Sequence, residues 1–220
     1  MSGNFRLNRV LSKPLTSLLL KTPLTPNQTT LLSLLFGVLA GCLFSSGISR
    51  WEITGALFYQ SAVILDNCDG EIARAKNSMS KFGAWLDIAC DLLVDLSLFL
   101  GIAIGTAKKG VPGPVLPFAL LCLGGVIAHF ILVILEKTKG FGPAAFGTPR
   151  PENETGRNFF LKVFDAFREG EASWFVLIFA CLKKTECLLW LGGIYMQILW
   201  IAAVFMNFKP LFLKSRDEPR

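Results

Sequence analysis

The chain has 220 residues, of which 52% are hydrophobic and only 17% are charged, and its formal net charge is +6. This composition excludes an intrinsically disordered protein and argues against an ordinary soluble domain. An excess of Lys and Arg can indicate nucleic acid binding. Here the basic residues gather between apolar runs, which is the pattern of a membrane protein, so no nucleic acid partner is expected.

The N-terminal segment alternates apolar residues with Arg and Lys over residues 4–21. This pattern predicts an amphipathic helix that lies in the membrane interface. Two prolines in the segment 22–27 then break the chain, and Asn27 or Thr29 is expected to cap the helix that follows. Residues 1–27 are therefore interpreted as an interfacial helix and its turn.

Six apolar runs follow, and most are long enough to cross a bilayer as a helix. They lie at about 28–47, 51–74, 82–107, 115–136, 168–182 and 187–208. The predicted fold class is an all-α integral membrane protein. A six-transmembrane-helix bundle at 28–208 would follow the interfacial helix and precede a tail at 209–220.

The basic residues also predict how the bundle is oriented. With the N-terminus in the cytoplasm, 17 of the 22 Lys and Arg residues fall in segments that would be cytoplasmic. Because Lys and Arg favour that side of the membrane, both termini and the loop at 137–168 are placed in the cytoplasm. A lipid bilayer is thus an expected partner of this multi-pass chain.

Acidic residues are concentrated where the chain is most apolar. Six of the 16 lie within residues 66–95: Asp66, Asp69, Glu71, Asp87, Asp91 and Asp95. Asp66 and Asp69 are three residues apart in the second predicted span, and Asp87 and Asp91 are four apart in the third, so each pair shares a helix face. With a rise of about 1.5 Å per residue, both pairs lie at similar heights above the cytoplasmic ends.

A charge at the centre of a bilayer costs on the order of 3 kcal/mol, and four carboxylates also repel one another. Bound divalent cations such as Mg²⁺ or Mn²⁺ would offset both the burial cost and the repulsion, because carboxylate oxygens are hard ligands that suit these ions. Gly83 on the same face would let a ligand approach, and Arg74 adds positive charge nearby. Cations with a basic rim suit a phosphate-bearing substrate in a cavity open to the cytoplasm. The alternative is that the aspartates pair with Arg and Lys and lock the bundle.

Residues 66–91 read DNCDGEIARAKNSMSKFGAWLDIACD. This segment resembles the signature of the CDP-alcohol phosphotransferase family, D-x2-D-G-x2-A-R-x8-G-x3-D-x3-D, at every fixed position. The matching residues are Asp66, Asp69, Gly70, Ala73, Arg74, Gly83, Asp87 and Asp91. Eight residues at fixed gaps make a specific match, and the predicted interfacial helix and six spans extend the resemblance over nearly the whole chain.

The resemblance implies an enzyme that transfers a phospho-alcohol group, phosphatidyl or similar, from a CDP-alcohol to an acceptor hydroxyl and releases CMP. Such transfer serves phospholipid or inositol-phosphodiester biosynthesis. It also implies two divalent cations held by Asp66, Asp69, Asp87 and Asp91, with Asp91 as the base for the acceptor hydroxyl. Nucleotide or phosphate contacts are implied for Pro26, Asn27, Gly70, Ala73, Arg74 and Gly83. Family members commonly form homodimers, and one is expected here.

Four residues outside the fixed pattern are candidates for an acceptor site: Glu71, Asp95, His129 and Arg168. Asp95 continues the helix face of Asp91 by one turn, but a packing role with a Lys or Arg fits equally well. His129 also fits a buried hydrogen-bonded side chain, and Arg168 a solvated helix start. The DGEIAR sequence is similar to the branch of the family that uses inositol phosphates, and ordinary phosphatidyl transfer from CDP-diacylglycerol is the second interpretation.

Two other functions fit part of the pattern. A divalent-cation transporter would use intramembrane carboxylates, but it would need acidic residues on several helices along a path through the membrane. Here they gather on two predicted helices. An inactive family member that serves as a scaffold conflicts with the intact signature.

Overall fold

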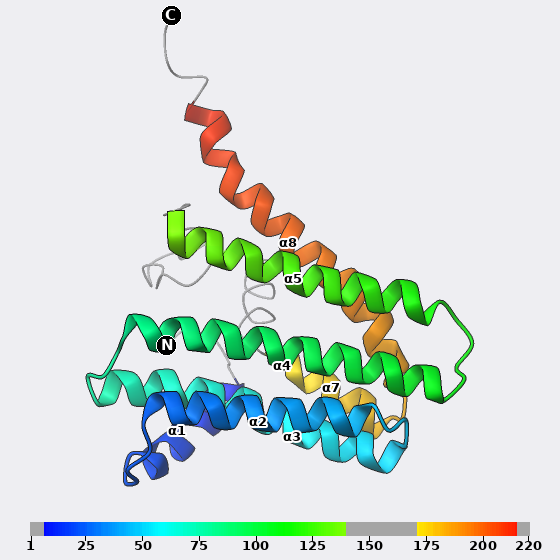
Figure 1. Cartoon of the computed structure of the whole chain (residues 1–220), viewed down its shortest axis with the longest axis horizontal. Coiled ribbons are helices and arrows are strands. Elements are labelled where there is room, and N and C mark those ends of the chain that lie inside the picture. Colours follow the sequence, from blue (N-terminus) through cyan, green and yellow to red (C-terminus); the bar gives the residue numbers. More distant parts are fainter. Residues whose placement is uncertain (1–6, 140–170, 215–220) are drawn as a thin grey trace, which may run out of the picture.

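The structure is a computed structural model, and it describes residues 7–139 and 171–214. Every regular element in those ranges is an α-helix (Figure 1). The helices are α1 (Leu7–Leu19), α2 (Pro26–Phe44), α3 (Ser49–Ala75), α4 (Lys81–Lys108), α5 (Val115–Lys139), α7 (Ser173–Cys181) and α8 (Glu186–Lys214). The predicted all-α class is confirmed for this part of the chain. Arg168 lies outside the described residues, as does most of the loop predicted at 137–168.

Within the described residues, three helices are long and apolar enough to cross a membrane: α2, α4 and the segment Val115–Leu135 of α5. The acidic and amide side chains of α3 make it less apolar than these three. The count of six spans therefore stays a prediction. Helix α8 runs to Lys214, so it continues past residue 209, where the tail was predicted to begin.

The start of α2 corrects one prediction. Its N-cap is Thr25, whereas Asn27 or Thr29 was expected. The backbone N–H of Gln28 donates to Oγ1 of Thr25 at 3.3 Å, and the backbone N–H of Thr25 donates to Oε1 of Gln28 at 2.9 Å. This pair is a capping box, and Pro26 then occupies a first-turn position where its missing N–H is tolerated. Asn27 consequently lies inside the first turn of α2.

Helix α2 packs along both α3 and α4, whereas α3 and α4 make few contacts with each other. The three helices lie side by side in Figure 1, and α5 and α8 form a second layer beyond α4. A Cβ on Gly41 would collide with the backbone of Ser97, and one on Gly101 with the backbone of Gly41. These glycines therefore allow α2 and α4 to cross at backbone contact. The backbones of α3 and α4 do not approach each other closely, so these two helices face each other through their side chains.

Helix α1 packs against α3 through its polar side. Asn8, Ser12 and Thr16 recur every four residues and are buried, whereas Val10 and Leu18 are each 60% exposed. The helix therefore turns its polar side toward the protein and its apolar side outward. That α1 lies in the membrane interface stays a prediction.

Candidate active site: an acidic cluster between two helices

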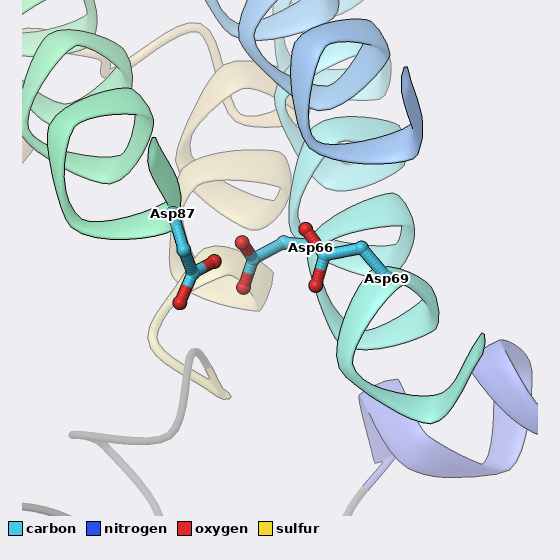
Figure 2. Close-up of side chains that lie close together, drawn as sticks. All are labelled: Asp66, Asp69 and Asp87. Atoms are coloured by element: carbon cyan, nitrogen blue, oxygen red, sulfur yellow. The ribbon is translucent and has the colours of Figure 1, made fainter. Parts of the chain in front are cut away.

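Three aspartates from two helices converge in the structure. Asp66 and Asp69 belong to α3, and Asp87 belongs to α4. One ligand oxygen from each carboxylate lies within 4.8 Å of those from the other two. Figure 2 shows the three carboxylates pointing toward one another from the facing helices. We call these three residues the acidic cluster.

The acids continue along α4 beyond the acidic cluster. Asp91 follows Asp87 by one turn, and its carboxyl lies close enough to that of Asp66 for the two groups to interact. Asp95 lies one turn further, where the Tyr59 hydroxyl donates a hydrogen bond to its Oδ1 at 3.3 Å. Asp91 is therefore adjacent to the acidic cluster, and Asp95 is separated from it by a turn and bonded to α3.

Helix α2 supplies Thr30, a residue that sequence interpretation missed. Thr30 is 4% exposed, and its hydroxyl donates a short hydrogen bond to Oδ2 of Asp69, which is 7% exposed. The same hydroxyl lies 3.1 Å from the carbonyl oxygen of Pro26, one turn earlier. Thr30 precedes Asp69 by 39 residues and lies outside the signature, so no local spacing could have joined the two.

Gly83 brings the start of α4 against the start of α2. A Cβ on Gly83 would lie 3.0 Å from Oδ1 of Asn27 and 3.1 Å from Oγ of Ser80, so a side chain there would press on both. Ser80 is the N-cap of α4, and its hydroxyl accepts a hydrogen bond from the Gly83 N–H at 2.9 Å. Two residues predicted on the nucleotide side therefore meet, although they come from different helices.

Three further residues predicted on the nucleotide side lie along the last turns of α3, whereas Pro26 begins α2. A Cβ on Gly70 would lie 3.4 Å from Nη1 of Arg74, so the guanidinium folds back over the glycine. Ala73 is half-buried and Arg74 is exposed. Gly70 directly follows Asp69, so the guanidinium that covers this glycine comes close to the acidic cluster.

Glu71 points away from the acidic cluster toward α1. Its two carboxylate oxygens accept hydrogen bonds from the Ser12 hydroxyl at 3.0 Å and the Thr16 hydroxyl at 2.6 Å. Its place in a variable slot of the signature suggested an acceptor site. The structure instead places it in the contact between α1 and α3, because successive residues of a helix point in different directions.

The remaining predicted acceptor residues are dispersed. His129 is half-buried in α5, and its ring lies edge-on to Phe130. Arg168, as noted, is outside the described ranges. Of the predicted acceptor residues that the structure describes, only Asp95 shares a helix face with Asp87 and Asp91, one turn beyond Asp91 on α4.

The side chains present fit a hard divalent cation. The ion pairs found in residues 7–139 and 171–214 are Lys109–Glu52 and Lys184–Glu186, so no aspartate of the acidic cluster has such a partner there. Lys137 is near enough for its charge to act on Asp87, yet its ammonium donates to the backbone carbonyl of Ala84 at 2.9 Å. Clustered carboxylates that form no ion pair within the described ranges are a donor set that suits Mg²⁺ or Mn²⁺.

Comparison with known proteins agrees with the signature. Residues 23–208 match the family model for CDP-alcohol phosphatidyltransferase. The chain therefore belongs to the CDP-alcohol phosphatidyltransferase family. This membership and the three apolar helices identify a membrane protein. They give no support to a cation transporter.

Among the relatives is a bifunctional IPC transferase and DIPP synthase of Archaeoglobus fulgidus, 33% identical over 204 residues. The match covers 92% of this chain but 36% of that protein, so the chain spans about a third of this relative's length. A phosphatidylinositol phosphate synthase of Mycolicibacterium smegmatis is 36% identical over 146 residues, covering 64% of this chain and 63% of the relative.

Solved structures of Mycobacterium tuberculosis phosphatidylinositol phosphate synthase share the fold. The complex with manganese and citrate has a TM-score of 0.63 at 23% identity, covering 90% of this chain and 89% of that one. The complex with CDP-DAG also has a TM-score of 0.63 at 23% identity, covering 91% and 94%. The fold described above is therefore one on which these synthases are built.

Proposed function

We propose that the chain is a metal-dependent CDP-alcohol phosphotransferase. It would transfer a phospho-alcohol group from a CDP-alcohol to an acceptor hydroxyl and release CMP. The observation that carries the proposal is the acidic cluster within a complete family signature. Its three carboxylates come from facing helices and have no ion-pair partner among the described side chains. The manganese-bound relative supports the use of a divalent metal.

We assign the aspartates two roles, which are metal binding and removal of the acceptor proton. Asp66, Asp69 and Asp87 would hold two divalent cations, Mg²⁺ or Mn²⁺, with Asp91 completing the set. When bound, the cations neutralise charge on the diphosphate and on the departing CMP. Asp91 would take the proton of the acceptor hydroxyl as the acceptor oxygen bonds to the β-phosphorus and the bond from that phosphorus to CMP breaks. Its place beside Asp66, one turn from Asp87, suits such a base.

The nucleotide would lie across the first turns of α2 and α4 and the last turns of α3. Gly83 and Gly70 keep the backbone free of side-chain bulk there, and Asn27 and Arg74 place polar groups directly against these two glycines. Pro26 fixes the turn that presents Asn27. Small residues flanking polar groups suit a flat base and a diphosphate that must reach the acidic cluster.

The acceptor or the donor alcohol is proposed to contain an inositol phosphate. The DGEIAR segment is the sequence feature behind this choice. Relatives named phosphatidylinositol phosphate synthase, such as that of M. smegmatis, support it. Asp95, bonded to Tyr59 one turn beyond Asp91, is the described residue placed to meet a polyol. Phosphatidyl transfer from CDP-diacylglycerol remains the second candidate, supported by the CDP-DAG-bound relative.

The proposed setting is a homodimer in the membrane, with both termini and the active site on the cytoplasmic side. The placement of 17 of 22 basic residues in segments on that side supports the orientation. The acidic cluster lies near the C-terminal end of α3 and the start of α4, on the same side as the basic residues Lys76 and Lys81.

The test is an activity assay on the purified full chain in detergent. The protein is mixed with Mn²⁺ or Mg²⁺, a CDP-alcohol and a panel of hydroxyl acceptors that includes inositol phosphate. CMP is measured by chromatography, and the product is identified by mass spectrometry. We expect CMP release that requires metal and acceptor. No CMP release with any donor and acceptor pair would contradict the proposed reaction.

The role of Asp91 is tested in the same assay. Asp91→Asn keeps the shape of the side chain but cannot take up the proton, so CMP release should be abolished. If Asp91→Asn releases CMP at the wild-type rate, the base has been assigned to the wrong residue.

A further inference from the structure

We propose that Thr30 is a positioning residue that holds the metal ligand Asp69 in its working orientation. The proposal rests on the proposed function, because it takes Asp69 as a ligand of a divalent cation. Thr30 lies outside the signature, and its contact with Asp69 is the single bond from α2 side chains to the acidic cluster in the described structure.

The contact is buried and specific. Thr30 and Asp69 are 4% and 7% exposed, so water has little access to either group. The hydroxyl donates to Oδ2 of Asp69, which occupies one of the two carboxylate oxygens and leaves the other unclaimed by Thr30. A carboxylate held at one oxygen cannot rotate freely. Thr30 therefore fixes the direction in which the remaining lone pairs of Asp69 face the cluster.

Helix α2 is itself anchored on both sides of Thr30. The capping box between Thr25 and Gln28 fixes the turn before it. One turn after it, the Ser33 hydroxyl donates to the backbone carbonyl of Ala62 on α3 at 3.0 Å. Because both ends of this short stretch are held, the hydroxyl of Thr30 is presented at a fixed place. A fixed donor can restrain a side chain that like charges would otherwise displace.

Neighbouring carboxylates act on Asp69 with like charge, and Arg74 offsets only part of it. Asp66 and Asp87 place ligand oxygens within 4.8 Å, and mutual repulsion drives the three carboxylates apart before any cation binds. Thr30 opposes this displacement without adding charge of its own. Loss of such an outer contact typically weakens metal binding by about 10- to 100-fold, which is the effect we expect here.

The test is Mn²⁺ binding to the purified full chain without substrates, followed by the electron paramagnetic resonance signal of free Mn²⁺. Thr30→Val keeps the side-chain volume and removes the donor, so the dissociation constant should rise by about 10- to 100-fold. Thr30→Ser restores a hydroxyl and should return the constant to near the wild-type value. In the CMP assay, Thr30→Val should lose activity at low Mn²⁺ and recover most of it at saturating Mn²⁺.

The matched control is Thr29→Val. Thr29 is 1% exposed in the same turn, and its hydroxyl lies 3.2 Å from the backbone carbonyl of Thr25, away from Asp69. The control removes the same buried hydroxyl and should leave Mn²⁺ binding unchanged. If Thr30→Val does not fold, as judged by its thermal transition, Thr30→Ala is measured in its place with the same expectation.

Two results would overturn the proposal and leave the proposed function standing. One is wild-type Mn²⁺ affinity in Thr30→Val, and the other is equal weakening by Thr29→Val, which would indicate packing rather than a hydrogen bond. A wild-type chain that binds no Mn²⁺ would overturn the metal assignment as well, so the two failures are distinguishable.

Discussion

Helix α3 carries buried carboxylates near both of its ends, and they are satisfied in opposite ways. Near its start, Glu52 is 1% exposed and forms an ion pair with Lys109 at the end of α4. Thr185 donates to the same carboxylate at 3.0 Å and accepts from the Lys109 ammonium at 2.8 Å. Near its end, Asp66 and Asp69 face Asp87 with no such cation in the described ranges.

The two ends of α3 differ in how the charge of their carboxylates is balanced. The contact of Glu52, Lys109 and Thr185 joins three parts of the chain and leaves no charge unbalanced, as a structural contact requires. The acidic cluster gathers negative charge that the described side chains do not balance. In the described ranges no lysine or arginine forms an ion pair with these aspartates, in contrast to Glu52 at the other end of α3, and this contrast supports the proposed cation site.

The largest effect is expected at the acidic cluster. Asp87→Asn removes one charged ligand, so CMP release should fall at least about 100-fold, beyond the usual effect of an outer contact. Thermal stability should be unchanged or higher, because the substitution relieves repulsion among the three carboxylates. Activity and the thermal transition are measured on the same preparation. An Asp87→Asn protein that keeps its activity would contradict the proposal that Asp87 holds a cation required for the reaction.

The opposite pattern is expected at the start of α3. Glu52→Gln leaves Lys109 without its counter-charge, so the free energy of unfolding should fall by about 3 kcal/mol. Mn²⁺ affinity should stay at the wild-type value, because the pair lies at the far end of the helix. The double variant Glu52→Gln/Lys109→Gln should regain part of the stability, since neither charge is then left alone. Weakened Mn²⁺ binding in the folded Glu52→Gln protein would show that the two ends are not separate.

A smaller effect is expected at the contact between α2 and α4. Gly83→Ala places a Cβ 3.0 Å from Oδ1 of Asn27, so that side chain must shift. The KM for the CDP-alcohol should rise several-fold while Mn²⁺ affinity changes little. Gly124→Ala is the control, because a Cβ there meets no atom within 4 Å and alanine also suits a helix. Equal KM values for the two variants would contradict the proposal that Asn27 and Gly83 lie at the nucleotide site.

The smallest effect is expected at Glu71. Gln can accept from Ser12 and Thr16 through its oxygen or donate to a hydroxyl through its amide, so Glu71→Gln should change activity less than about twofold. Glu71→Ala leaves both hydroxyls without their acceptor and should lower the free energy of unfolding by about 1–3 kcal/mol. A KM for the acceptor that rises sharply in Glu71→Gln would instead support its predicted place in an acceptor site.

The sequence predicted the main helices well for a simple physical reason. Apolar runs bounded by Pro, Gly and charge gave 28–47, 51–74, 82–107 and 115–136, and the structure has α2, α3, α4 and α5 within a few residues of these bounds. The pairing of Asp66 and Asp69 with Asp87 was also predictable, because helical spacing and depth follow from the chain alone. Asp91 was placed beside them by the same spacing.

What the sequence did not reveal depends on contacts between distant segments. Thr30 and Tyr59 are ordinary helical residues until α2, α3 and α4 come together, and only then do they bond to Asp69 and Asp95. The polar side of α1 was likewise expected to face water or lipid headgroups. In the structure this polar side contacts Glu71. The place of Glu71 within the signature had led us to predict it near the acceptor.

We propose above all that the acidic cluster binds the divalent cation on which CMP release depends. The most direct measurement is equilibrium Mn²⁺ binding to the purified wild-type chain and to the Asp66→Asn/Asp87→Asn double variant, with Glu52→Gln as a control for loss of a buried carboxylate elsewhere. We expect binding by the wild type and Glu52→Gln and none by the double variant at the same concentrations. Equal binding by the wild type and the double variant would contradict it.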